Sequence, residues 1–251
     1  MQQQSNTYII AFTLGLCVVL GGALSWAATA LKPLQQAAVA LDTKKQILGA
    51  VIDDLSQIDV STTYDARITS LVVNAKGEEV ANDAEGNPLV AEKVNIAKEF
   101  KKPAAERLLP VFCLKSEADP TKIEAYILPM FGNGLWNNIW GFVALEPDLN
   151  TVKGASFDHT GETPGLGARI TTKEVQNRYK GKKIKDGSGN LVAVQMVKGE
   201  NNAGLNDNQV DGMSGATITG NGVNIMLTEY LGYYQPYFTK LQGGKQQAFA
   251  R

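Results

Sequence analysis

The first pattern along the chain is an uncharged, mostly apolar run from Tyr8 to Leu31. As a helix it is long enough to cross about 30 Å of hydrocarbon. Tyr8 and Trp26 stand near its ends, where amphipathic aromatic side chains favour the headgroup region. The pattern predicts a transmembrane helix over residues 8–31, preceded by a short tail, residues 1–7, and followed by a soluble domain, residues 32–251.

One alternative is that this segment is a signal peptide that is removed after export, because Ala28-Thr29-Ala30 resembles a cleavage site. Signal peptides begin with a positively charged region, whereas Met1–Asn6 contains no lysine or arginine. A retained anchor is therefore favoured. Gly21, Ser25 and Ala28 lie at helical spacing and would let another helix approach closely, although such small residues are also ordinary in membrane helices.

Helical periodicity returns three times after the apolar run. Apolar residues recur at helical spacing between Leu34 and Leu55, which predicts one or two helices leaving the membrane. A short helix is expected over Thr171–Tyr179. A stronger amphipathic pattern covers Thr219–Tyr234, with one apolar face made of Val223, Met226, Leu227, Tyr230, Leu231 and Tyr234.

Short apolar runs separated by turn residues predict strands. These runs are Ile68–Val73, Ala125–Leu128, Trp140–Leu145 and Leu191–Val197. Together with the helices they predict one α+β domain, in which a mixed or antiparallel sheet is flanked by helices.

Composition excludes several classes of function. Lysine and arginine (24) nearly balance aspartate and glutamate (25), so no basic field exists to attract nucleic acid, which is excluded as a partner. Cys17, Cys113 and His159 are far apart in the sequence, so the chain has no spacing typical of a zinc, iron–sulfur or c-type haem site. Gly132-Asn133-Gly134 and Gly220-Asn221-Gly222 lack the third glycine of a dinucleotide fingerprint. Redox chemistry on this chain would need an organic cofactor, and NADH would bind elsewhere.

The segment Asp211–Gly220 is rich in small and hydroxylated residues and comes directly before the amphipathic helix. A helix N-terminus presents free amides and the positive end of a dipole, which suits an anion such as a phosphate. Small neighbours leave the hydroxyl of Thr217 open to a modifying enzyme. The alternative is that Ser214 and Thr217 only cap the helix.

The pattern Asp211-x-x-Ser214-Gly215-Ala216-Thr217 resembles the acceptor motif of proteins that carry FMN as a phosphoester on threonine, attached by a dedicated flavin transferase. Two more segments, Phe131–Gly141 and His159–Ala168, resemble further motifs of covalent FMN-binding domains. With the single N-terminal span, these motifs resemble the C-subunit family of the sodium-translocating NADH:quinone oxidoreductase over most of the chain.

This resemblance implies covalent FMN on Thr217 and no catalytic or metal-binding residue. Tight backbone approach to a flat ring suits glycines, and apolar or aromatic side chains suit its faces. For Trp136 the alternative is plain packing, and for Pro164-Gly165 it is a turn. The residues expected around the cofactor are Ser214, Gly215, Ala216, Glu162, Thr163, Leu166, Gly167 and Trp136.

The resemblance also implies an electron relay subunit of a sodium-translocating NADH:quinone reductase, which does not itself bind NADH. The expected partners are other membrane and iron–sulfur or flavin subunits of the complex, the flavin transferase and the lipid bilayer. The expected location is the bacterial cytoplasmic membrane, with a single span and the domain on the periplasmic side. Lys32, Lys44 and Lys45 favour the opposite orientation, but three scattered lysines are a weak signal.

Two alternatives remain open at this point. The flavin subunit of the related ferredoxin-linked electron-transport complex shares the Glu162–Gly165 and acceptor motifs but usually lacks a segment like Leu135–Trp140. A non-redox, membrane-anchored binding module is the alternative from another class.

Overall fold

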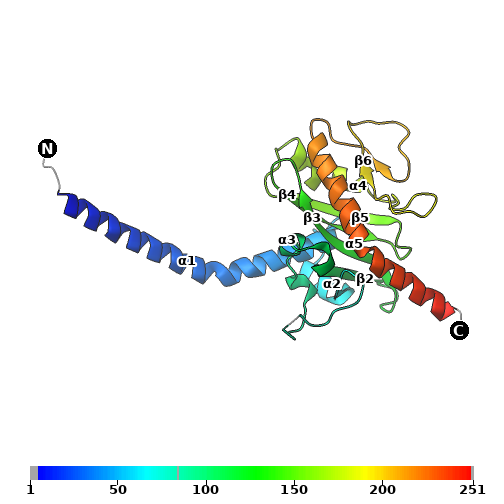
Figure 1. The fold of residues 1–251 in the computed structure, drawn as a ribbon, viewed down its shortest axis with the longest axis horizontal. Coiled ribbons are helices and arrows are strands. Elements are labelled where there is room, and N and C mark those ends of the chain that lie inside the picture. The colour runs from blue at the N-terminus through cyan, green and yellow to red at the C-terminus, as the bar shows by residue number, and fades with distance from the viewer. Residues whose placement is uncertain (1–4, 84, 250–251) are drawn as a thin grey trace. The chain divides into compact units, whose positions relative to one another are not determined.

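The computed structural model describes residues 5–83 and 85–249 (Figure 1). Its internal contacts group into two units that meet between Asp42 and Thr43. One continuous helix, α1 (Asn6–Gly49), runs through the first unit and ends in the second, where one or two helices were predicted. In length and composition α1 can cross a membrane, with a mean hydropathy of 2.1 over its best window. Signal sequences meet the same criteria, so the boundaries 8–31 stay a prediction.

The second unit is built on a five-stranded antiparallel sheet whose strands follow the order of the chain. Adjacent strands are therefore joined by simple reversals rather than crossovers. The β3–β4 reversal matters most, because its last paired residues are Asn133 and Asn138, so residues 134–137 form a tight loop at one end of the sheet. The strands are β1 (Ile68–Val73), β2 (Leu109–Lys115), β3 (Ile123–Asn133), β4 (Asn138–Leu145) and β5 (Val152–His159).

Both faces of this sheet are covered. Val111 and Cys113 face a core shared with the long helix α5 (Thr217–Phe249), whereas Phe112 and Leu114 face the end of α1 and the short helix α2 (Val60–Arg67). Successive side chains of a strand point to opposite faces. Burial of both faces explains why β2 is apolar almost throughout and shows no alternation. Neither β2 nor β5 was predicted from the sequence.

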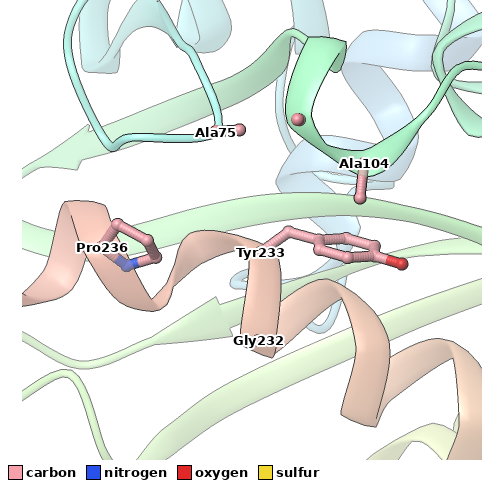
Figure 2. A pocket seen from close by; sticks show the side chains of 6 residues that line it. Ala75, Ala104, Gly232, Tyr233 and Pro236 are labelled. Carbon is pink, nitrogen blue, oxygen red and sulfur yellow. The ribbon is translucent and has the colours of Figure 1, made fainter.

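Helix α5 packs along β3 and carries the predicted apolar face, extending from Thr217 to Phe249 (Figure 1). Its buried Tyr234 hydroxyl reaches the carbonyl oxygens of Pro110 (2.8 Å) and Pro129 (3.1 Å), on adjacent strands. Ala75, Ala104, Gly232, Tyr233 and Pro236 line an apolar hollow beside the helix (Figure 2). At 1.5 Å per residue, Gly232 lies roughly 22 Å along α5 from its first residue.

The remaining elements are short. The predicted helix over Thr171–Tyr179 is α4 (Lys173–Asn177), capped by the Thr172 hydroxyl, which accepts a hydrogen bond from the Val175 amide. Only Gln195–Met196 (β6) of the predicted strand Leu191–Val197 is a strand, paired in parallel with β7 (Gln209–Val210). That prediction was largely wrong because the amides of residues 192 and 193 bond to a loop carbonyl. The others are α3 (Ile96–Phe100), η1 (Ala91–Lys93), η2 (Ala104–Glu106) and η3 (Gly167–Thr171).

Candidate functional site

Thr217 is the first residue of α5 and is half-buried. Gly215 before it has φ +75°, a backbone conformation that favours glycine. A Cβ there would lie 2.8 Å from Leu166 Cδ2, so the loop and Leu166 approach closely. Ser214 is exposed and Ala216 is buried. The geometry leaves a threonine hydroxyl at a helix start, beside an apolar side chain from another loop.

The first turn of α5 is suited to an anion. The Ala216 amide bonds to the Met213 carbonyl (3.1 Å), and the Gly220 amide bonds to the Ala216 carbonyl (3.0 Å). The amides in between belong to the turn that helix geometry leaves without intrahelical acceptors. This turn contains no acidic residue. Amides and the positive end of the dipole therefore favour a negative group at Thr217.

A buried carboxylate, that of Glu162, lies under this turn. The side chain is 4% exposed. Its Oε1 accepts from the Trp136 amide (3.0 Å), and its Oε2 accepts from the Thr219 hydroxyl (2.5 Å). Burial alone would raise the pKa of this carboxyl, but the Thr219 hydroxyl and the amides of residues 135–137 hold the pKa below its usual value.

Glycines leave the space that this carboxylate fills. A Cβ at Gly134 would lie 2.5 Å from Glu162 Oε1. A Cβ at Gly167 would lie 2.5 Å from both Glu162 Oε2 and Thr219 Oγ1. Real Cβ atoms essentially never approach so closely. The loop of residues 134–137, which we call the tryptophan loop, and the 162–167 loop therefore need glycine for this contact.

Trp136 is held at the surface rather than in the core. Its side chain is 69% exposed, and its indole Nε1 donates to Thr163 Oγ1 (3.2 Å). Leu166 and Ile218 are also exposed. From Thr43 onward, the described part of the chain exposes few large apolar side chains. Apart from Val90, they lie in the 134–137 loop, in the 162–167 loop or near the start of α5: Leu135, Trp136, Leu166, Ile218 and Ile225. Of these side chains, Leu166 approaches Gly215 and Ile218 follows Thr217 directly, so both offer apolar surface next to Thr217.

An ion network fixes the loop before α5. Glu200 accepts from Arg169 (2.5 Å) and, more distantly, from Arg178 (3.4 Å). Arg169 together with the Ser214 amide and Arg178 lowers the pKa of the Glu200 carboxyl to about 2. Arg178 also donates to the carbonyl oxygen of Asp211 (3.1 Å). The loop that leads to the predicted acceptor is therefore tied to η3 through Arg169 and to the end of α4 through Arg178.

The Asp211 carboxylate, the first residue of the predicted motif, points into the same loop. Its Oδ2 accepts from the Asn201 amide (2.6 Å), and its Oδ1 accepts from the Asn202 amide (3.1 Å) and side chain (2.7 Å). These bonds close the 201–211 segment on itself. Asp211 thus shapes the loop that leads to Thr217.

Comparison with known proteins identifies the family of the chain. Residues 134–232 match the FMN-binding domain family. The C subunit of the Na(+)-translocating NADH-quinone reductase from Pseudomonas aeruginosa is 35% identical, covering 92% of this chain and 93% of that protein. The C subunit from Neisseria meningitidis serogroup B is 34% identical over 97% and 96%.

This chain belongs to the C-subunit family of the Na(+)-translocating NADH-quinone reductase. Among solved structures, the C subunit from Parabacteroides distasonis matches with a TM-score of 0.70 and 36% identity, covering 83% of this chain and 97% of that one. NqrC from Shewanella oneidensis matches with a TM-score of 0.69 and 28% identity, covering 82% and 99%. The predicted family and fold class are confirmed.

In this member of the C-subunit family, the fold brings the sequence-predicted site residues together. Direct contacts join the tryptophan loop, the 162–167 loop and the start of α5. His159, the last residue of β5, accepts a hydrogen bond from the Glu162 amide (3.1 Å). Thr219, Arg178 and Glu200 were missed, because nothing in the sequence marks a helix hydroxyl or distant charges as parts of one site.

Proposed function

We propose that this chain is the FMN-carrying electron-transfer subunit of a Na(+)-translocating NADH-quinone reductase, with FMN joined through its phosphate to the Thr217 hydroxyl. The observation that carries the proposal is the position of Thr217. This half-buried residue begins a long helix whose first-turn amides and dipole favour a phosphate at its hydroxyl. Membership in the C-subunit family and the match to the FMN-binding domain family support the same cofactor.

The residues around Thr217 fit a flavin. An isoalloxazine ring is flat and largely apolar, and Trp136, Leu166 and Ile218 offer exposed apolar surface on the loops and helix beside the acceptor. Covering these side chains with a ring would remove apolar area from water. The residues assigned to the cofactor site are Ser214, Gly215, Ala216, Thr217, Thr163, Leu166, Gly167 and Trp136, with Glu162 supporting them from below.

FMN, when bound, supplies reversible electron transfer, and the protein supplies attachment and surroundings that set its potential. A phosphoester leaves the isoalloxazine ring chemically unmodified, so the link secures the cofactor without changing its ring. Attachment requires a flavin transferase as a maturation partner. Ser214 and Gly215 are exposed, which leaves the acceptor loop accessible to such an enzyme.

In this proposal the protein relays electrons within the complex. It receives them from an iron–sulfur centre of neighbouring membrane subunits and passes them to another covalently bound FMN. Helix α1 anchors the chain in the bacterial cytoplasmic membrane, with the domain on the periplasmic side. The stretch 8–31 of α1 contains no ionisable carboxylate or base, so sodium movement is assigned to the assembly.

The test of the cofactor is a denaturing gel of full-length protein expressed with and without the flavin transferase. A band that fluoresces only with the transferase, and that is lost in Thr217→Ala, is expected. Thr219→Ser, which keeps the neighbouring hydroxyl, is the matched control and should stay fluorescent. Absence of fluorescence from wild-type protein made with an active transferase would refute the cofactor and favour a non-redox anchored module.

Two further observations test the assembly and the orientation. Copurification with the other subunits of the NADH-quinone reductase is expected, whereas copurification with a ferredoxin-linked complex would assign the chain to that relative. In sealed vesicles, protease should digest the domain from the periplasmic side. Digestion from the cytoplasmic side alone would contradict the proposed orientation.

A further inference from the structure

Three segments that are distant in the sequence meet at the side chain of Glu162. One carboxylate oxygen holds the tryptophan loop through the Trp136 amide at 3.0 Å. The other holds α5 through the Thr219 hydroxyl at 2.5 Å. The Glu162 amide is itself fixed, because it donates to His159 Nδ1 (3.1 Å) at the end of β5. The segments that surround Thr217 are thus joined through one side chain.

The carboxylate is charged and lacks a partner cation. Among the side chains of residues 5–83 and 85–243, no lysine or arginine forms an ion pair with Glu162. Hydrogen bonds from the backbone amides of residues 135–137 and from the Thr219 hydroxyl stabilise the carboxylate instead. Burying a carboxylate without a cation is costly, and a neutral glutamine could fill the same space. The fold therefore keeps a negative charge buried in contact with the first turn of α5.

The Glu162 carboxylate is closely packed against Gly134 and Gly167. Cβ atoms at Gly134 or Gly167 would lie 2.5 Å from its oxygens. A displacement of the carboxylate would therefore move the tryptophan loop or the 162–167 loop. Thr219 is two residues from Thr217 on the same helical turn, so its bond to Glu162 also fixes the rotation of the acceptor turn.

We propose that Glu162 is a positioning residue for the flavin: it fixes the Trp136 loop against the first turn of α5, and its charge lowers the midpoint potential of the FMN held there. This inference rests on the proposed attachment of FMN to Thr217. Reduction places electrons supplied by the redox partner on the ring. A fixed negative charge buried beneath the same site opposes that added charge, and so favours the oxidised form.

Three substitutions test the charge and the positioning contact. Glu162→Gln keeps the length of the side chain and one carbonyl oxygen but removes the charge. Thr219→Val keeps the shape of threonine and removes the hydroxyl, whereas Thr219→Ser keeps the hydroxyl. Neither Glu162 nor Thr219 is the proposed attachment residue, so loss of the covalent bond itself is not expected from these changes.

The experiment uses the full chain in detergent, produced with the flavin transferase, and measures both the rate of FMN attachment and the midpoint potential of the attached FMN. Glu162→Gln should shift the potential to more positive values. Thr219→Val should slow attachment on the order of 10- to 100-fold, as small misplacements of a reacting group do. Thr219→Ser should restore the wild-type rate.

Three results would overturn the proposal. An unchanged potential in flavinylated Glu162→Gln removes the role of the charge. Equal attachment rates in Thr219→Val and Thr219→Ser remove the positioning role, and this pair answers the question even if the Glu162 variant fails to fold. Wild-type protein without FMN refutes the proposed function as well, which distinguishes that failure from the first two.

Discussion

Substitution of Gly167 by alanine tests the packing of the site directly. A Cβ at Gly167 would lie 2.5 Å from Glu162 Oε2 and from Thr219 Oγ1, where ordinary contacts begin at 3.4 Å. One or both partners must therefore move by about 0.9 Å. Overpacking of this kind costs about 1–3 kcal/mol of unfolding free energy. In a domain of this size each kcal/mol corresponds to about 2–4 °C, so the melting temperature should fall by roughly 2–12 °C.

Gly161 provides a matched control in the same segment. A Cβ there meets only Asn137 Cβ at 3.8 Å, and neither Gly161 nor Gly167 has a positive φ. Gly161→Ala should therefore stay within about 0.5 kcal/mol of the wild type. Urea unfolding of both full-length variants in detergent, followed by circular dichroism, measures the difference. Equal stability of the two variants would refute the assigned packing of Glu162, Gly167 and Thr219.

Three further predictions concern the charges near the site and the core of the domain. The pKa of Glu200 is held near 2 by Arg169, against an ordinary value of 4.5, so its stabilisation is present above pH 4.5 and lost as pH falls to about 2. At pH 7 the free energy of unfolding of the wild type should therefore exceed that of Glu200→Gln, and near pH 2 the two values should converge. A difference in unfolding free energy that persists near pH 2 would contradict the ion network. Burial raises the pKa of the Cys113 thiol to about 11, so a thiol reagent at pH 8 should modify Cys113 only after the protein unfolds. Peptide mapping that finds rapid modification of Cys113 in the native protein would show instead that the thiol is accessible. Tyr234→Phe leaves two buried strand carbonyls without their hydroxyl donor and should cost about 1–3 kcal/mol in thermal unfolding, whereas an unchanged melting temperature would mean that these bonds contribute nothing.

The parts of the fold that the sequence predicts are those with a clear periodicity. Helix α5 has one apolar face, so its position was predicted close to its observed start. Strand β2 is buried on both faces by α5 and by α2. Since a strand buried on both sides loses its alternation, β2 was not separable from other apolar runs.

The site shows the same division between local and long-range information. The acceptor motif is continuous in sequence, so Thr217 could be named without a structure. Glu162 was expected among the residues around the cofactor, whereas both of its oxygens are engaged by Trp136 and Thr219. Those partners are 26 and 57 residues away in the sequence. The direction of a loop side chain depends on such tertiary contacts, which no local pattern encodes.

The most direct test of FMN attachment at Thr217 is the mass of the intact, denatured chain made with an active flavin transferase, followed by peptide mapping. We expect a single increment for one FMN phosphoester, located on the peptide that contains Thr217 and absent from Thr217→Ala. An unmodified wild-type chain, or an increment that persists in Thr217→Ala, would contradict the proposed attachment.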